Sequence, residues 1–215
     1  MPDNESFQTK HLAEQFTSLE QQRETSELGM WVFLATEVLF FGSLFLALTV
    51  YRTMYKDIFT EAARHLNVVI GTANTAILLT SSLTMVMAIQ AIKDGKIKQT
   101  FNYLIGTAFL GFCFLGLKAV EYREDFAEHL FPGQHFLLGP QAKLFFFLYF
   151  FMTALHALHL FVGICVVSVM AYRSKKGNFS KDYFNPIEVT GLYWHFVDIV
   201  WVFLFPLLYL AGRNS

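Results

Sequence analysis

The chain has 215 residues, of which 54% are hydrophobic and only 15% are charged, and it contains 25 phenylalanines. A soluble domain carries about 25% charged residues, so this composition excludes an ordinary soluble domain and favours a small bundle of membrane helices. The net charge of -1 gives no reason to expect nucleic acid as a partner.

The chain divides into a polar start and an apolar remainder. Residues 1–28 are polar, contain no hydrophobic segment typical of a signal peptide, and are expected to form a cytoplasmic N-terminal segment. Residues 29–215 are expected to form the membrane domain. Five apolar runs in it reach the roughly 20 helical residues that cross a bilayer core of about 30 Å. They cover residues 29–51, 68–92, 102–122, 144–172 and 190–211. Because backbone amides in lipid need partners within their own segment, the predicted fold is all-α, an integral membrane bundle of five transmembrane helices.

The connections between the runs predict the turns and the orientation. Asp94-Gly95 is typical of a turn after the second run. Cytoplasmic loops carry an excess of lysine and arginine. The side with the N-terminus has nine such residues against six on the other side: Lys10, Arg23, Lys93, Lys96, Lys98, Arg173, Lys175, Lys176 and Lys181. We therefore expect the N-terminus in the cytoplasm and the C-terminus outside.

Ionisable side chains at membrane depth are expensive, so they invite a functional interpretation. Glu37 lies about eight residues into the first run, or roughly 12 Å deep at 1.5 Å per residue. It is either a carboxyl group hydrogen-bonded inside the bundle or a site near a lipid headgroup or a proton route. Lys118 and Glu121 stand three residues apart in the third run, where a structural ion pair is expected.

Four further polar residues form two pairs, each on one helix face. His156 and His159 share a face of the fourth run, and His195 and Asp198 share a face of the fifth. An aspartate beside a histidine can set its tautomer. Polar groups in membranes commonly bond between helices, so we expect interhelical hydrogen bonds from these four. The expected structural polar network consists of Glu121, His156, His195 and Asp198.

The depths of the histidines disfavour a metal or haem in this chain. Only His156, His159 and His195 lie in apolar runs, and the last two are roughly 20 and 7 Å from the inner face. Cys113 and Cys165 lie in different runs, which disfavours a disulfide, a zinc site or a dinuclear copper site. We therefore expect no catalytic, metal or cofactor-binding residue. The alternative is a self-standing membrane enzyme or b-type cytochrome that uses the three histidines.

Five short motifs are spread over the five apolar runs. They are WVFLATEVLFF (31–41), NTAILLTSS (74–82), KAVEY (118–122), TALHALH (153–159) and YWHFVDIVW (193–201). In this order they resemble the W-x-F-L-x-S-E-x-x-F-F, N-T-x-x-L-L-x-S-S, Q-x-x-E-Y, T-G-x-H-G-x-H and Y-W-H-F-V-D-x-V-W motifs of subunit III of the haem-copper respiratory oxidases. The last motif matches almost letter for letter and is highly specific.

The chain departs from the pattern of that family in several places. It resembles the five-helix form, whereas the longest members have seven helices. Ala154 and Ala157 replace glycines, and Lys118 replaces a glutamine. The segment 204–210 also resembles accessory subunits of nitric oxide reductases, which belong to the same superfamily, so that complex is the alternative.

The resemblance implies an accessory, non-catalytic subunit of a terminal oxidase in aerobic respiratory electron transport, which uses cytochrome c or quinol. Its partners would be catalytic subunit I and subunit II, which would carry the haem and copper, and phospholipids. It would support assembly, proton uptake and sustained turnover in a bacterial-type inner membrane. Carried over by motif, Glu37 and His159 would line a lipid cleft, and Arg173 would bind a lipid headgroup.

Overall fold

The computed structural model describes residues 12–133, 140–181 and 183–210, and these ranges form helices and no β-strand. The helices are α2 (Leu19–Met54), α3 (Lys56–Arg64), α4 (Val68–Lys93), α5 (Ile97–Ala127), α6 (Pro140–Lys175) and α7 (Asn185–Tyr209). All but α3 are long and apolar enough to cross a membrane. The predicted all-α bundle of five membrane helices is therefore confirmed.

Side-chain caps and glycine turns set where several helices begin and end. The Ser18 hydroxyl accepts a hydrogen bond from the backbone of Gln21 at the start of α2, and Asn67 caps the first turn of α4 in the same way. Gly95, at a φ of 74°, makes the tight turn between α4 and α5 that Asp94-Gly95 predicted.

Helix α2 begins at Leu19, so part of the polar N-terminal segment continues the first membrane helix. The boundary between residues 28 and 29 stays a prediction. The start of that segment (1–11), the middle of the third loop (134–139) and the C-terminal residues 211–215 lie outside the described residues.

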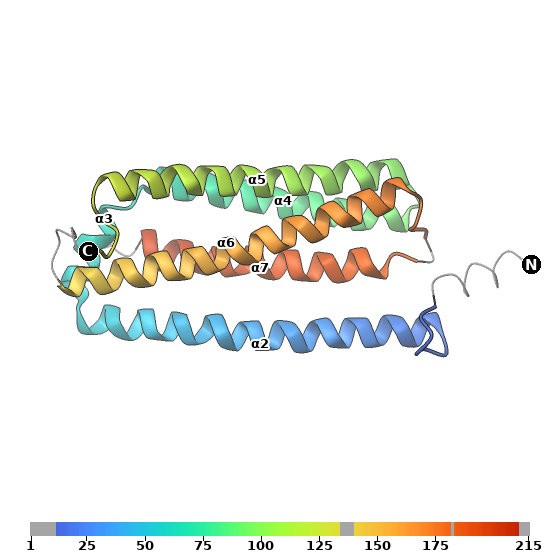
Figure 1. Cartoon of the computed structure of the whole chain (residues 1–215), viewed down its shortest axis with the longest axis horizontal. Coiled ribbons are helices and arrows are strands. Elements are labelled where there is room, and N and C mark those ends of the chain that lie inside the picture. The colour runs from blue at the N-terminus through green and yellow to red at the C-terminus, as the bar shows by residue number, and fades with distance from the viewer. Residues whose placement is uncertain (1–11, 134–139, 182, 211–215) are drawn as a thin grey trace, which may run out of the picture.

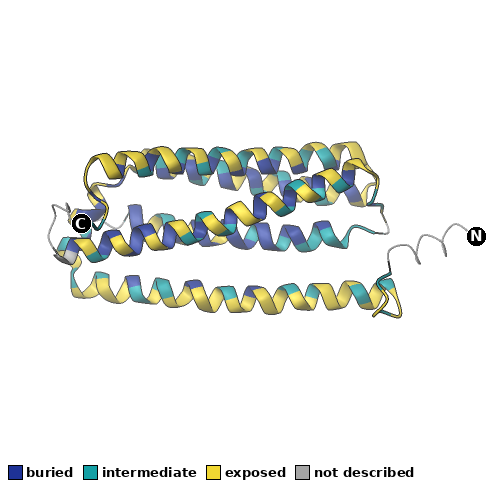
Figure 2. Ribbon diagram, in the orientation of Figure 1, coloured by how far each residue is buried: buried dark blue, intermediate teal, exposed yellow. Residues whose placement is uncertain are grey.

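Helix α7 lies at the centre of the bundle and α2 lies at its edge. In Figure 1, α4 and α5 run along one side, α6 crosses α7 in the middle, and α2 runs along the opposite side. In the most apolar stretch of each helix, 56% of the residues of α7 are buried but only 17% of those of α2. Figure 2 shows the consequence, a largely exposed α2. Both flanks of α2 are therefore available to lipid or to a partner.

The two ends of the bundle differ in the elements that they carry. We call the end with the start of α2, the α4–α5 turn and the start of α7 the inner end, and the opposite end the outer end. The short helix α3 closes the outer end, where it joins α2 to α4. Its Phe59 is 1% exposed and packs edge-on against Phe145 of α6, with ring centroids 5.2 Å apart.

Candidate functional site

The contact between Glu37 and His159 joins α2 to α6 within the membrane-spanning part of the bundle. The Glu37 Oε2 atom lies 3.2 Å from His159 Nε2, and the two side chains are 17% and 18% exposed. They are 122 residues apart in the sequence. Two of the residues that the sequence assigned to a lipid cleft therefore meet at the interface of two helices.

The second nitrogen of His159 restricts where the protons of this pair can be. Its Nδ1 atom lies 2.8 Å from the carbonyl oxygen of Leu155, which can only accept a hydrogen bond. Nδ1 therefore carries a hydrogen, and the hydrogen bond to Glu37 needs one further proton, on Nε2 or on the carboxyl group. The pair is net neutral in both arrangements, which suits its depth in the membrane.

Aromatic side chains surround this pair and connect it to α7. The Phe41 ring packs edge-on against the His159 ring, with centroids 5.2 Å apart. The Tyr193 hydroxyl donates a hydrogen bond of 2.9 Å to the His159 carbonyl oxygen, and its ring lies 6.1 Å from that of Phe33. Helices α2, α6 and α7 therefore meet at one point, where the polar groups are paired and aromatic rings pack against them.

Arg173 lies at the inner end of α6, fourteen residues after His159. At 1.5 Å per residue this is about 21 Å along the helix, and 3.6 residues per turn bring both residues to nearly the same face. The Arg173 guanidinium lies 5.6 Å from the centre of the Phe179 ring. No acidic group of the described chain pairs with it in an ion pair, so its charge is available to an anion at the membrane surface.

His195 bonds across the bundle to α4. Its Nδ1 atom lies 2.7 Å from the hydroxyl oxygen of Ser82. The neighbouring Asp198 is 4% exposed and does not bond to the His195 ring. Ser82 faces Asp198 from α4, but neither carboxyl oxygen has a hydrogen bond of normal geometry within the described residues. The partner of His195 is therefore Ser82 on a neighbouring helix, and not Asp198 on its own helix.

His156 is packed in an aromatic cage. It is 1% exposed, and its ring lies 5.5 Å from that of Phe114 and 5.1 Å from that of Trp201. Neither ring nitrogen has a hydrogen-bond partner among the described residues. The three membrane histidines thus face three different environments, and no three His, Cys, Asp or Glu side chains in the described chain converge as a metal site would require.

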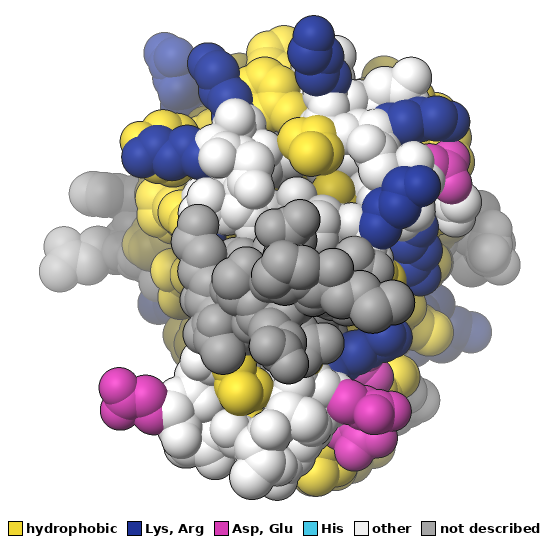
Figure 3. All heavy atoms as spheres, turned by 90° about the vertical axis from the view of Figure 1, so that its right-hand side faces the viewer, with side chains coloured by type: hydrophobic (Ala, Val, Ile, Leu, Met, Phe, Trp, Pro, Cys, Tyr) yellow, Lys and Arg dark blue, Asp and Glu magenta, His cyan; other side chains and the backbone are white. Residues whose placement is uncertain are grey.

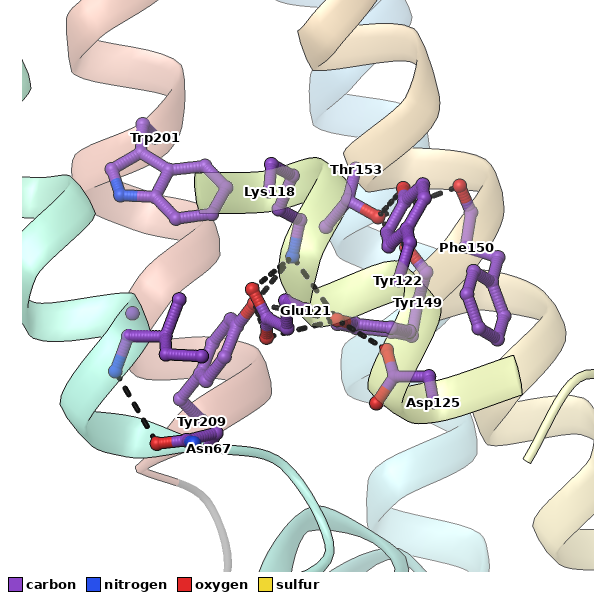
Figure 4. Close-up of polar contacts among 12 residues, drawn as sticks. Asn67, Lys118, Glu121, Tyr122, Asp125, Tyr149, Phe150, Thr153, Trp201 and Tyr209 are labelled. Atoms are coloured by element: carbon purple, nitrogen blue, oxygen red, sulfur yellow. Dashed lines mark hydrogen bonds and ion pairs between the residues drawn. The ribbon is translucent and has the colours of Figure 1, made fainter. Parts of the chain in front are cut away.

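A buried ionic cluster joins α5, α6 and α7 near the outer end (Figure 4). Lys118 and Glu121 are 3% and 1% exposed, and Lys118 Nζ lies 3.0 Å from Glu121 Oε2. The ammonium also donates to the hydroxyls of Tyr149 and Tyr209, at 3.0 and 2.5 Å, so all three of its hydrogens have acceptors. Tyr209 in turn donates to Glu121 Oε1 at 2.7 Å, and Tyr149 lies 3.1 Å from an oxygen of Asp125. Four aromatic rings lie 4.8–5.5 Å from Nζ.

Sequence reasoning placed Lys118 and Glu121 together but missed the other members of this cluster. Asp125 stands four residues after Glu121, so the helical spacing that identified the pair could also have found it. Tyr149 and Tyr209 come from other helices, 28 and 88 residues away from Glu121, and no local pattern indicates them.

The similarity to known proteins covers nearly the whole chain. A family model described as cytochrome c oxidase subunit III matches residues 14–213, which include the five long helices and every site residue described above. Cytochrome c oxidase subunit 3 of Thermostichus vulcanus is 33% identical over 187 residues, 86% of this chain and 87% of that protein.

Two further relatives come from other oxidases. Subunit 3 of the cytochrome bo(3) ubiquinol oxidase of Buchnera aphidicola subsp. Acyrthosiphon pisum is 28% identical over 192 residues, 88% of each chain. The heme-copper oxidase subunit I+III of Aeropyrum pernix is 33% identical over 191 residues, which is 85% of this chain and 22% of that longer protein.

Proposed function

The chain belongs to the cytochrome c oxidase subunit III family, and from this we propose that it is the accessory, non-catalytic subunit III of a haem-copper terminal oxidase in aerobic respiratory electron transport. The names of its relatives include both cytochrome c and ubiquinol oxidases, so either electron donor is compatible with the proposal. The same names favour an oxidase over the alternative, an accessory subunit of a nitric oxide reductase.

The proposed partners are the catalytic subunit I and subunit II, which carry the haem and copper. A relative named subunit I+III supports a direct contact with subunit I. The exposed flanks of α2 support it too, because they offer apolar surface at membrane depth to partners or lipid. In this complex the chain would support assembly, proton uptake and sustained turnover without a redox step of its own.

The proposed ligand is a phospholipid bound at Glu37, His159 and Arg173. The observation that carries this proposal is the pairing of Glu37 with His159 at 3.2 Å on facing helices, with Arg173 about 21 Å further toward the inner end of the same helix. An arginine at the membrane interface attracts a lipid phosphate, and an exposed cation near an anionic surface contributes about 1 kcal/mol. The apolar surface between these points suits an acyl chain.

Replacing Arg173 by alanine is expected to remove one retained phospholipid from the purified complex, because the headgroup loses its cation. Glu37→Ala should loosen lipid retention as well, since it leaves His159 without its partner across the interface. Glu37→Gln keeps a hydrogen bond to His159 and should preserve both the lipid and the initial oxidase rate. Lipid mass spectrometry after purification in mild detergent measures the retention. Lys176→Ala, at the same end of α6, is the matched control.

An unchanged lipid content in Arg173→Ala would contradict the lipid role of this residue. A second measurement is the oxidase rate, followed over many turnovers. The wild type and Glu37→Gln should keep their rate longer than Glu37→Ala.

We also propose that the inner end faces the cytoplasm of a bacterial-type cell and that the C-terminus lies outside. Lysine and arginine side chains gather around the inner end in Figure 3, which supports this orientation through the positive-inside rule. Reporter fusions after Ser215 and in the turn at Lys96 should report opposite sides of the membrane. A report from the same side would contradict the proposed topology.

A further inference from the structure

A hollow between α2, α4 and α7 leads from the inner end of the bundle toward its interior. It has a volume of about 330 Å³, and its lining includes Arg23, Glu27, Ile89, Glu188 and His195. His195 stands seven residues after Glu188, or about 10 Å further into the membrane along α7. A water molecule occupies roughly 30 Å³ in the liquid, so the hollow has room for several. Water can therefore reach the ring of His195 from the inner surface.

Charged side chains around the mouth of this hollow favour the entry of water. Arg23 Nε bonds to Glu27 Oε1 at 2.8 Å, and Arg23 Nη2 lies 3.5 Å from Glu188 Oε2. Lys93 Nζ of α4 bonds to the other Glu188 oxygen at 2.7 Å. The side chains of Arg23 and Lys93 are 51% and 43% exposed. Two cations and two carboxylates from α2, α4 and α7 thus surround the entrance, whereas Glu37 of α2 is bonded to α6.

Beyond the hollow, His195 and Ser82 lead to a buried carboxyl group. His195 is half-buried, and because its Nδ1 atom lies 2.7 Å from the Ser82 hydroxyl, Nε2 is the nitrogen left to water in the hollow. Asp198 is 4% exposed, and Ser82 faces it from α4. A serine hydroxyl has one donor hydrogen and two acceptor lone pairs, so Ser82 can bond to His195 and to Asp198 at once. The terminal torsion of an aspartate is broad, so the carboxyl group can turn toward Ser82.

The surroundings of Asp198 favour the protonated form of its carboxyl group. Neither carboxyl oxygen has a hydrogen-bond partner among the described residues, and none of the ion pairs in that part of the chain includes Asp198. On its outer side, His156 and Lys118 both pack on the Trp201 ring, one turn further along α7. A buried carboxylate without a cation or a donor is far more costly than a neutral carboxyl group. Asp198 is therefore expected to hold a proton at rest.

We propose that Asp198 is a proton-binding site that exchanges its proton with water at the inner end through Ser82 and His195. In the loaded state Asp198 donates to the Ser82 oxygen, Ser82 donates to His195 Nδ1, and Nε2 carries a hydrogen. On release, Nε2 gives its proton to water, the Ser82 hydrogen moves to Nδ1, and the Asp198 hydrogen moves to Ser82. One proton has then left, the imidazole is neutral in its other tautomer, and Ser82 donates to the Asp198 carboxylate. Loading reverses each transfer.

Infrared spectroscopy of the intact oxidase complex tests the site. Asp198→Asn should remove one band of a protonated carboxyl group, since asparagine has nearly the same size but binds no proton there. After transfer of the wild type into deuterium oxide, this band should shift as deuterium replaces the proton. Ser82→Ala should slow the shift roughly 100-fold, the low end of what a positioned group contributes to a proton transfer, because the hydroxyl between Asp198 and His195 is lost.

Two variants control for the loss of a hydroxyl group from the membrane interior. Ser82→Thr keeps the hydroxyl and should exchange like the wild type. Ser168→Ala makes the same substitution on α6, where the hydroxyl bonds to the Ile164 carbonyl oxygen of its own helix, and it should also exchange like the wild type. Identical carboxyl bands in Asp198→Asn and the wild type would overturn the inference. Equal exchange in Ser82→Ala and Ser168→Ala would overturn it as well, because water would then reach Asp198 by another route.

The inference deepens the proton-uptake role and rests on the proposed function only for that use, since the exchange of a proton at Asp198 is a property of this chain. Proton uptake by the complex is therefore measured separately, and Ser82→Ala should slow it while Ser168→Ala leaves it unchanged. If Ser82→Ala slows exchange at Asp198 but not proton uptake, the proton-binding site stands and the proposed role of the chain in proton uptake fails.

Discussion

Replacement of Lys118 by methionine is expected to destabilise the subunit by about 3–5 kcal/mol, the usual cost of removing one partner from a buried ion pair. The Lys118 ammonium is buried and donates to Glu121 and to the hydroxyls of Tyr149 and Tyr209. Without it, the Glu121 carboxylate keeps the two tyrosine hydroxyls as donors but has no cation at 1% exposure. Methionine fills much of the same volume, so the loss would report the missing charge rather than a cavity.

The stability of Lys118→Met can be read from thermal dissociation of the purified complex and from the amount of subunit in the membrane. Lys98→Met is the control on the same helix, since Lys98 is exposed and a surface substitution of this kind is usually within about 0.5 kcal/mol of the wild type. Combining Lys118→Met with Glu121→Gln should recover part of the loss, because the unpaired charge is then removed as well. Wild-type stability in Lys118→Met would contradict the importance of the pair, and a double variant as unstable as the single one would assign the loss to packing.

The extent to which this cluster could be predicted depends on distance along the chain. Lys118 and Glu121 are one helical turn apart, and their contact follows from the helix itself. Tyr149 and Tyr209 reach the cluster only because α6 and α7 pack against α5. Apolar run length was enough to predict the five helices, but it contains no information on which helix faces meet.

The contacts of polar residues inside the membrane were hard to predict for the same reason, since they depend on which helix faces meet. The depth of Glu37 in the first run was readable from the sequence, but its contact with His159 depends on how α2 leans on α6. For His195 the local spacing offered Asp198 and the membrane setting favoured a bond between helices, but only the structure identifies the partner, Ser82 on α4. The Ser82 hydroxyl is 113 residues from His195 in the sequence, but it reaches the ring because α4 and α7 pack closely there. Such close packing depends on contacts of glycine and other small residues, whose partners on other helices cannot be read from the sequence.

Gly111 is one of these contacts, and replacing it by valine is expected to have the second large effect. A Cβ atom at this position would lie 2.9 Å from Ile164 Cγ1 and 2.9 Å from Trp194 Cη2. The Trp194 indole is fully buried and its nitrogen donates to Ser81, so it has little room to move. Overpacking of this kind costs about 1–3 kcal/mol and occasionally more.

Gly116→Val separates this steric effect from the change in helix propensity. Gly116 lies on the same helix and an added Cβ there meets no atom within 4 Å, so both variants replace glycine by valine in α5 and only Gly111→Val pushes on α7. Since Tyr193, the neighbour of Trp194, bonds to the His159 carbonyl oxygen, a shift of α7 should also loosen the contact between Glu37 and His159. We therefore expect Gly111→Val to lower both the thermal stability of the complex and its phospholipid content, while Gly116→Val keeps both near the wild type. Equal values for the two variants would show that α5 and α7 are not locked together at Gly111.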